Sequence, residues 1–402
     1  MAMLRPGTFA LTALLAALTA VGPLSTDMYL PSLPDIALRL DASTAQVQFT
    51  ISAYLIGFAV GQIFYGPLSD RYGRKPVLLV AMGLYCLATL LCALSTSIEM
   101  LVASRLLQAI GGSGSIVLAR AIVRDLYSGN RAGRELSLIA SVMALAPVFA
   151  PIAGGALQAG FGWRSVFLVA VTVALAGTAV VALKLPETLK TRTTERVSVG
   201  SMVMSFGVVG RHPVYLAYLA MGSTCYAGLF AWISGASFVL QNLYGLTPFN
   251  FGVAFALSAL GYMVGSAIAA RLVVRIGLDG IIGLGAILLT VGGLGMTASL
   301  VLGLTSAWSL VLPVAIYLAG LGMVLAQSIA GALVPFPDHA GAASSLLGFV
   351  QQVLAAACGA LVGWLLGQNA WPVAGAVAFM GLATLLVWLF TRRLRASASQ
   401  HH

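Results

Sequence analysis

The sequence predicts an all-α integral membrane protein in which twelve membrane-spanning helices form two bundles of six. The 402-residue chain is 60% hydrophobic and only 8% charged, whereas a soluble domain carries about 25% charged residues. Its mean hydropathy is +0.99. The charges are clustered, because no Asp, Glu, Lys or Arg lies between Arg211 and Arg271, or between Asp279 and Asp338. Apolar runs of about 20 residues are long enough to cross the hydrocarbon core of a bilayer as helices.

Charged and turn-forming residues bound these apolar runs and give twelve predicted spans. The longest polar connector, KLPETLKTRTTERVSVG from Lys184, falls between the sixth and seventh spans. We therefore predict an N-terminal bundle over residues 1–184, a cytoplasmic linker over 185–212 and a C-terminal bundle over 213–396. The tail, 397–402, ends in His401 and His402, which resemble the remnant of a purification tag. The predicted spans are residues 8–29, 46–66, 76–95, 99–121, 135–157, 164–184, 214–240, 249–271, 280–302, 308–333, 341–366 and 371–391.

The distribution of Lys and Arg predicts how the chain is oriented. With a cytoplasmic N-terminus, the cytoplasmic connectors hold 18 of the 21 Lys and Arg residues, and the outer connectors hold only Arg39 and Arg164. This asymmetry follows the positive-inside rule. The remaining cation, Arg105, lies inside a span. We expect both termini to be cytoplasmic.

Composition also argues against several classes of protein. The net charge of +10 does not indicate nucleic-acid binding, because the cations are spread over many short connectors where the positive-inside rule explains them. The sequence contains no nucleophile–base set, metal-ligand cluster or phosphate-binding loop, so it predicts neither an enzyme nor a metal or cofactor site. The expected partners are membrane lipid and small molecules, and the protein is expected to be monomeric. Four cysteines fall inside apolar spans and are expected to be packing residues: Cys86, Cys92, Cys225 and Cys358.

Two ionisable side chains stand out inside the spans. Charge within a bilayer is costly and therefore indicates function. Asp27 lies near the outer end of the first span, and Arg105 lies about two turns into the fourth span from the same face, so both are expected at similar depth. We expect them to meet as a pair or through a bridging water and to couple transport to proton movement, because burial and a nearby guanidinium act oppositely on the protonation of a carboxyl group. Alternatively, Asp27 caps its helix before Pro31 and Arg105 donates to backbone carbonyls.

The stretch GPLSDRYGRKPVLL, residues 66–79, concentrates charge between the second and third spans. Its glycines permit close approach and unusual backbone angles, and its prolines mark helix edges. Asp70, the lone acid there, can accept hydrogen bonds from a helix N-terminus or pair with an arginine of the fourth span. The alternative is a plain positive-inside loop. The predicted cytoplasmic gate consists of Gly66, Asp70, Arg71, Gly73, Arg74, Arg120 and Arg124.

Two further patterns concern the architecture. A shift of 204 residues aligns Arg71-Tyr72-Gly73 with Arg275-Ile276-Gly277, a weak echo that suggests two repeats with a site between them.

In the fifth span, prolines kink a helix and small residues let neighbouring helices approach closely. We expect a tight hinge there that blocks proton leakage, formed by Pro147, Pro151, Gly154 and Gly155. Generic membrane-helix composition is the alternative.

These motifs resemble a known family. GPLSDRYGRKPVL resembles the signature between the second and third helices of the major facilitator superfamily, and RLLQAIGGSG and APVFAPIAGGAL resemble its fourth and fifth helices. STDMYLPSLPDIA, LFAWISGASFVLQNLYGL and FPDHAGAASSLLGF are similar to the bicyclomycin and chloramphenicol resistance (Bcr/CflA) subfamily of drug–proton antiporters. The resemblance implies the major facilitator fold. It also implies that the loop around Asp70 latches the two halves and that the fifth-span pattern belongs to a proton-driven exporter.

An adaptable apolar pocket is expected to be lined by aromatic and uncharged polar side chains. The candidates are Tyr29, Tyr54, Phe58, Gln62, Tyr226, Phe230, Tyr317, Gln327, Gln351 and Gln352, any of which is alternatively a packing or lipid-facing residue.

Taken with the resemblance, the sequence predicts proton-coupled export of small drug-like molecules by alternating access in a bacterial inner membrane, with protons as the coupling ion. Export of a sugar or another metabolite is the alternative within that class. A proton-coupled uptake symporter would share the fold, but the fifth-span pattern argues against it.

Overall fold

A computed structural model of the chain describes residues 8–189, 191–192, 199–336 and 340–399. Throughout these residues the chain forms helices joined by short turns, with no strand, which confirms the all-α membrane fold. The chain divides into two compact units. Unit 1 contains residues 1–197 with the short segment Pro248–Gly252, and unit 2 contains Ser198–Thr247 and 253–402. The division falls inside the linker predicted over residues 185–212.

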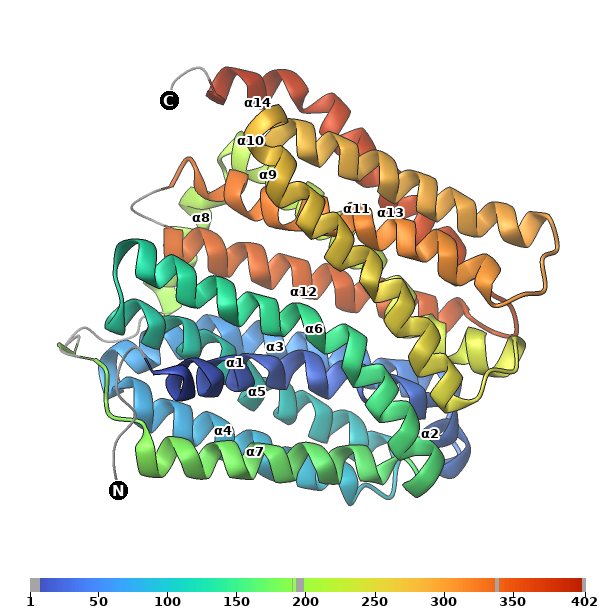
Figure 1. Cartoon of the computed structure of the whole chain (residues 1–402), viewed down its shortest axis with the longest axis horizontal. Coiled ribbons are helices and arrows are strands. Elements are labelled where there is room, and N and C mark those ends of the chain that lie inside the picture. Colours follow the sequence, from blue (N-terminus) through green and yellow to red (C-terminus); the bar gives the residue numbers. More distant parts are fainter. Residues whose placement is uncertain (1–7, 190, 193–198, 337–339, 400–402) are drawn as a thin grey trace. The chain divides into compact units, whose positions relative to one another are not determined.

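Unit 1 consists of long helices that follow one another through short turns (Figure 1). Ser43 begins α3 with a capping box, in which its side chain accepts from the Gln46 amide and the Gln46 side chain accepts from the Ser43 amide. Gly73 ends α3 with a φ of 104°, which favours glycine. The helices are α1 (Phe9–Asp27), α2 (Leu33–Arg39), α3 (Thr44–Tyr72), α4 (Arg74–Ala93), α5 (Ile98–Leu126), α6 (Gly129–Phe161) and α7 (Arg164–Lys184).

Unit 2 repeats this plan with two additions. A helix, α8, lies within the predicted linker, and another, α14, follows the last predicted span. A turn of π-helix, Val239–Leu243, continues α9. The helices are α8 (Val199–Val209), α9 (Pro213–Phe238), α10 (Pro248–Val301), α11 (Trp308–Leu333), α12 (Ala340–Leu365), α13 (Trp371–Phe390) and α14 (Arg392–Ser399).

Helix α10 accounts for two predicted spans. Its 54 residues would extend about 81 Å, whereas a hydrocarbon core is about 30 Å thick. Gly277, with a φ of 70° and a ψ of 172°, interrupts the helix, between the spans predicted over residues 249–271 and 280–302. Eleven described helices are long and apolar enough to cross a membrane, and dividing α10 at Gly277 gives the twelve that the sequence predicts.

The turn at Gly277 is held by the last helix of the chain. Arg395 of α14, only 3% exposed, pairs through Nε with Asp279 Oδ1 at 2.6 Å. Arg395 Nη2 also donates to the Trp388 carbonyl at 2.9 Å, and Trp388 Nε1 donates to the Asp279 carbonyl at 3.1 Å. The segment following the final membrane-length helix is therefore fastened to the middle of α10.

Glycines bring the helices of each unit into backbone contact. A Cβ atom on Gly111 of α5 would lie 2.5 Å from the Tyr85 nitrogen and 2.7 Å from the Ala81 carbonyl oxygen of α4. In unit 2, a Cβ atom on Gly320 of α11 would lie 2.5 Å from the carbonyl oxygen of Gly285. Such close approach is typical of membrane helices, whose association depends on packing rather than on exclusion of water.

We predict that Gly111→Leu destabilises unit 1, because the new side chain would displace the α4 backbone. The expected loss is about 2 kcal/mol, measured as a lower melting temperature of the purified protein in detergent. Gly83→Leu is the matched control, because a Cβ atom on Gly83 of α4 would meet nothing within 4 Å. Equal melting temperatures for the two variants would show that the α4–α5 contact is not close in solution.

Candidate functional site

The first candidate site surrounds Arg105, which lies inside unit 1 with no exposed surface. Its Nη1 group donates to the carbonyl oxygen of Ser25 in α1 at 3.0 Å and to Oε1 of Gln108 at 2.6 Å. Gln108 lies one helical turn further along α5, so one helix supplies both the cation and an acceptor. These bonds reduce the cost of keeping a guanidinium away from water.

Two tyrosine rings enclose the same guanidinium. Arg105 Cζ lies 4.6 Å from the ring centre of Tyr29 and 4.2 Å from that of Tyr54, distances at which an aromatic face attracts a cation. Each ring is fixed by its own hydroxyl. The Tyr29 and Thr50 hydroxyls are 2.8 Å apart, and the Tyr54 hydroxyl donates to the Gly22 carbonyl at 3.2 Å.

A chain of polar groups returns from Gln108 to α1. Gln108 Nε2 donates to Thr89 Oγ1 at 2.9 Å, and Thr89 donates to the Tyr85 carbonyl at 2.6 Å. The Tyr85 hydroxyl in turn lies 2.7 Å from Ser25 Oγ. Because Ser25 also accepts from Arg105, the polar network joins α1, α4 and α5 around the buried cation.

The network does not satisfy the whole guanidinium. Arg105 Nε and Nη2 are buried without a hydrogen-bond partner, as are both polar atoms of the Gln48 side chain, which is also fully buried. Unpaired polar groups in an interior cost free energy. The Arg105 site therefore keeps donors available for a further group.

Asp27 lies close to this network along the chain but is not paired with it. It is the last residue of α1 and is only 6% exposed. None of the four ion pairs among the described residues includes Asp27 or Arg105. The sequence predicted a direct pair or a contact through a bridging water, and the direct pair is not found among the described residues. Arg105 instead donates to the Ser25 carbonyl, as the alternative interpretation expected, and to Gln108. The proton-coupling role of these residues stays a prediction.

The second candidate site lies at the turn between α3 and α4. Arg74, 8% exposed, pairs through Nη1 with Asp70 Oδ1 at 2.5 Å and through Nε with Asp125 Oδ2 at 2.8 Å. Its Nη1 group also donates to Ser69 Oγ at 2.6 Å. The turn therefore contains a shared arginine between two carboxylates, one from α3 and one from α5.

The segment after α7 completes this turn. Glu187 accepts from the Arg74 amide at 3.0 Å and from the Lys75 amide at 3.3 Å, two of the amides that a helix N-terminus leaves unpaired. Thr188 Oγ1 donates to Asp125 Oδ2 at 3.2 Å. A Cβ atom on Gly73 would lie 2.5 Å from Glu187 Oε2, a contact that this flexible side chain can relieve by moving, so glycine is favoured here chiefly by its φ of 104°.

The sequence offered two contacts for Asp70, with a helix N-terminus or with Arg120 or Arg124 of the fourth span, and the second of these is not found among the described residues. Asp70 binds Arg74 of its own turn, and no ion pair joins it to Arg120 or Arg124 in the part of the chain that the structure describes. The acid-binding arginine lies four residues further along the chain, and α5, which extends beyond the fourth predicted span, contributes the carboxylate of Asp125 instead. The predicted latch between the two halves stays a prediction. Of the remaining gate residues, Arg71 stacks on Tyr72 and Gly66 faces open space.

Of the predicted hinge residues, Gly154 has a clear packing role. Both prolines, Pro147 and Pro151, lie within one continuous helix, α6. A Cβ atom on Gly154 would lie 2.8 Å from Met28 Cα, so α6 approaches the backbone immediately after Asp27. The last predicted hinge residue, Gly155, lies next in the same helix. The hinge function itself stays a prediction.

The predicted pocket-lining residues of unit 1 fall into two groups. Tyr29 and Tyr54 form the Arg105 site, and Phe58 stacks on Tyr54 with ring centres 6.2 Å apart. Gln62, one turn beyond Phe58 on α3, is half-buried. Three of these four residues therefore surround or adjoin the buried cation.

The predicted lining residues of unit 2 are less uniform. Tyr317 is buried and donates to the Cys225 carbonyl at 3.2 Å, which indicates a packing role between α11 and α9. Tyr226 packs on Phe230 with ring centres 5.0 Å apart. Gln351 Nε2 and Gln352 Oε1 are buried without partners, as expected of groups available to a ligand, while Gln327 is half-buried.

Sequence reasoning missed several residues of both sites. Gln108 lies three residues after Arg105, and this helical spacing was a usable signal. Asp125 is one of only 11 acids in the chain. Glu135, a carboxylate at the start of the fifth predicted span, was also missed; it accepts a hydrogen bond from Thr12 Oγ1 at 2.6 Å. Ser25, Thr89, Tyr85 and Glu187 gave no signal, because their roles depend on contacts between distant segments.

Comparison with known proteins identifies the family. The model of the Major Facilitator Superfamily matches residues 15–360. The chain belongs to the Major Facilitator Superfamily. This is a family of transporters rather than a class of enzymes, and the superfamily signature recognised around Asp70 is confirmed. The protein is therefore a multi-pass membrane protein.

Curated relatives cover most of the chain. It is 37% identical over 88% of its length to the "Uncharacterized MFS-type transporter YdgK" of Bacillus subtilis, matching 88% of that protein. It is 30% identical over 96% of its length to the "Bicyclomycin resistance protein homolog" of Haemophilus influenzae, and 30% identical over 96% to "Multidrug resistance protein D" of Escherichia coli. Each of these matches covers 97% of the relative. These names agree with the subfamily resemblance found in the sequence.

A solved structure shares the fold. A POT family transporter in complex with 5-aminolevulinic acid superposes with a TM-score of 0.79 at 14% identity, covering 98% of each chain. At this identity the likeness shows the fold alone.

We predict that Glu187→Ala loosens the start of α4, because the Arg74 and Lys75 amides lose their acceptor. The expected cost is about 1 kcal/mol, as for loss of a helix cap, with faster hydrogen exchange at these two amides. Glu187→Gln is the control, since its amide oxygen still accepts one of the two bonds and should give an intermediate effect. Unchanged exchange in Glu187→Ala would contradict the contact.

Proposed function

We propose that the protein is a proton-coupled antiporter that exports small amphiphilic drugs by alternating access. Relatives covering nearly the whole chain are named for bicyclomycin resistance and for multidrug resistance, which supports drug efflux. One observation carries the coupling proposal: Arg105 is buried, and its Nε and Nη2 groups have no hydrogen-bond partner among the described residues. Asp27 is also buried and follows Ser25, whose carbonyl accepts from Arg105, by two residues. Ionisable groups in such positions mark proton relays and ligand sites in transporters.

In the proposed cycle, Asp27 carries the proton. A buried carboxylate without a cation costs free energy, so its charge depends on what lies beside it. Arg105 stays in place because two rings, a carbonyl and an amide side chain hold it. Small movements of α1 relative to α5 would then change the separation of the two charges and release or admit a proton.

The α3–α4 turn has a mechanical role in this proposal. Asp70, Arg74, Asp125 and Glu187 tie α3, α4, α5 and the segment after α7 together. Such a tie makes that end of unit 1 move as one body, which is what rocking between outward-facing and inward-facing states requires. Asp70 is half exposed, so it keeps accepting capacity beyond Arg74 for a latch contact.

We predict that Asp27→Asn abolishes drug transport driven by a pH gradient while the protein still folds and inserts. The amide has nearly the same shape but carries no titratable proton. The measurement is drug uptake into inverted vesicles with an imposed gradient, together with drug affinity of the purified protein. Near-normal gradient-driven uptake by the variant would show that Asp27 does not carry the proton.

Glu135→Gln is the matched control, because Glu135 is also a carboxylate on a membrane-length helix and its side chain is partly buried. Among the described residues it accepts a hydrogen bond from Thr12. It should retain gradient-driven uptake. Loss of coupling in Glu135→Gln with coupling intact in Asp27→Asn would move the proton site to α6.

We predict that export of a neutral drug responds to membrane potential as well as to the pH gradient. One proton exchanged for one neutral molecule moves a net charge across the membrane. Doubly charged cations should be poor substrates, because a site with one acid and one arginine has no spare negative charge for them. Transport is compared under potential alone and under a pH gradient alone. Complete indifference to potential, or efficient pumping of dications, would show the one-carboxylate argument to be mistaken.

A further inference from the structure

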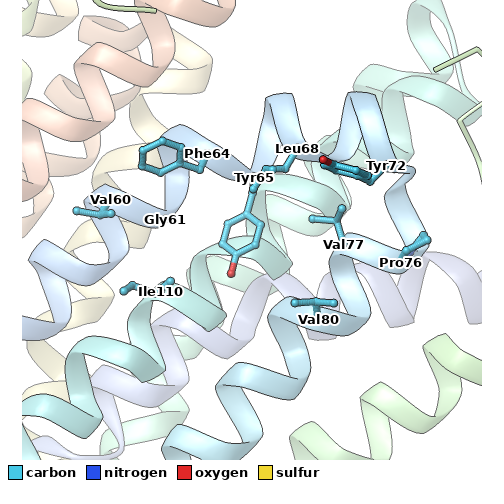
Figure 2. Close-up of a pocket in the computed structure, with 10 residues that line it drawn as sticks. All are labelled: Val60, Gly61, Phe64, Tyr65, Leu68, Tyr72, Pro76, Val77, Val80 and Ile110. Carbon is cyan, nitrogen blue, oxygen red and sulfur yellow. The ribbon is translucent and has the colours of Figure 1, made fainter. Parts of the chain in front are cut away.

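An apolar groove lies within unit 1, on the side of α3 that faces α4 and α5 (Figure 2). Its volume is about 410 Å³. Helix α3 supplies one wall and the beginning of α4 the other, while a single α5 residue closes one end. The lining residues are Val60, Gly61, Phe64, Tyr65, Leu68, Tyr72, Pro76, Val77, Val80 and Ile110.

The groove has the length of one lipid chain. Val60 and Tyr72 are twelve residues apart on α3, about 18 Å along the helix axis, and one leaflet of hydrocarbon is about 15 Å thick. The groove is open to its surroundings, since Val60 is 38%, Phe64 37% and Val80 72% exposed. These residues lie on membrane-length helices, so an apolar ligand such as a lipid chain fits this depth of the molecule.

One end of the groove carries an unpaired positive charge. The Arg71 guanidinium stacks 5.3 Å from the ring centre of Tyr72, a lining residue. Among the described residues Arg71 has no acidic partner. Asp70 and Asp125 bind Arg74, and Glu187 binds the α4 amides. The charge is therefore available to an anion at the end of the groove.

Lys75 adds a second cation at the same turn. Its Nζ group donates to the Ala182 carbonyl at 2.8 Å and meets no carboxylate in the described part of the chain. An apolar channel of leaflet length that ends at uncompensated cations matches a lipid with a negatively charged headgroup. Basic residues at the cytoplasmic surface of a membrane attract such lipids.

We propose that the groove binds one acyl chain of an anionic phospholipid, whose phosphate pairs with Arg71. The chain lies against Phe64, Val77 and Val80, and the headgroup lies at the α3–α4 turn. This site is separate from the Arg105 network and does not depend on which substrate is transported. A bound lipid would add a negative charge beside the Asp70–Arg74–Asp125 cluster.

The test uses the full-length protein, purified in detergent and examined by native mass spectrometry. It is titrated with phosphatidylglycerol and with phosphatidylcholine of the same acyl chains. We expect the first phosphatidylglycerol molecule to bind ~5-fold more tightly than the first phosphatidylcholine molecule. This is the affinity that one basic residue contributes near an anionic headgroup. Arg71→Ala should remove this preference, and Arg71→Lys should retain most of it.

The acyl chain is tested by filling the groove. Val80→Trp places a large ring in the groove and should lower the first-site occupancy of both lipids several-fold. Leu87→Trp is the matched control, because Leu87 is a 58% exposed residue of the same helix outside the groove. Arg275→Ala is the matched charge control, because Arg275 occupies the aligned position in unit 2 and is exposed.

Three results would overturn the proposal. Equal affinity for the two lipids would exclude headgroup recognition. If Leu87→Trp lowers lipid binding as much as Val80→Trp, or Arg275→Ala as much as Arg71→Ala, the lipid contacts are unspecific. Loss of drug binding in Val80→Trp with unchanged lipid binding would assign the groove to the drug instead.

Discussion

Unit 1 is organised around a positive charge kept away from water. Arg105 is fully buried, and every neighbouring element contributes to its environment. Helix α1 gives the Ser25 carbonyl, α3 gives the Tyr54 ring, and α4 gives Thr89, which fixes Gln108. An unpaired charge in an interior is so costly that the register of these helices is constrained by it. A shift of one turn in α1 or α5 would remove the carbonyl or the rings from the guanidinium.

The sequence predicted the helices well, because membrane spans depend on local composition. Asp27, Arg105 and Asp70 also stood out, since charge is rare in such a chain. Their partners were not predictable. The Asp70 carboxylate was expected to accept from a helix N-terminus or to pair with Arg120 or Arg124, yet it pairs with Arg74 on its own turn. The partner of Arg105 is a backbone carbonyl in α1, 80 residues away, and every residue offers a carbonyl. Only the folded packing decides which carbonyl is used.

The two units fasten corresponding turns with opposite charge. In unit 1 the turn at Gly73 is closed by a carboxylate, Glu187, from the segment after the last helix of the bundle. In unit 2 the turn at Gly277 is closed by a cation, Arg395, from the segment after the last helix of that bundle. The weak sequence echo of Arg71-Tyr72-Gly73 in Arg275-Ile276-Gly277 therefore accompanies a shared mechanical arrangement. The chemistry of the closing contact differs while its place in each unit is the same.

The arrangement has a consequence for how the protein is made. Asp279 leaves the ribosome 116 residues before Arg395, which is roughly 6–23 s at ordinary rates of translation. Glu187 likewise follows Arg74 by 113 residues. The turn in each bundle can therefore close only after the final segment of that bundle has been synthesised. The final segment of the first bundle is synthesised before most of the second bundle. Neither turn can therefore reach its final set of contacts while the rest of its own bundle is still being synthesised.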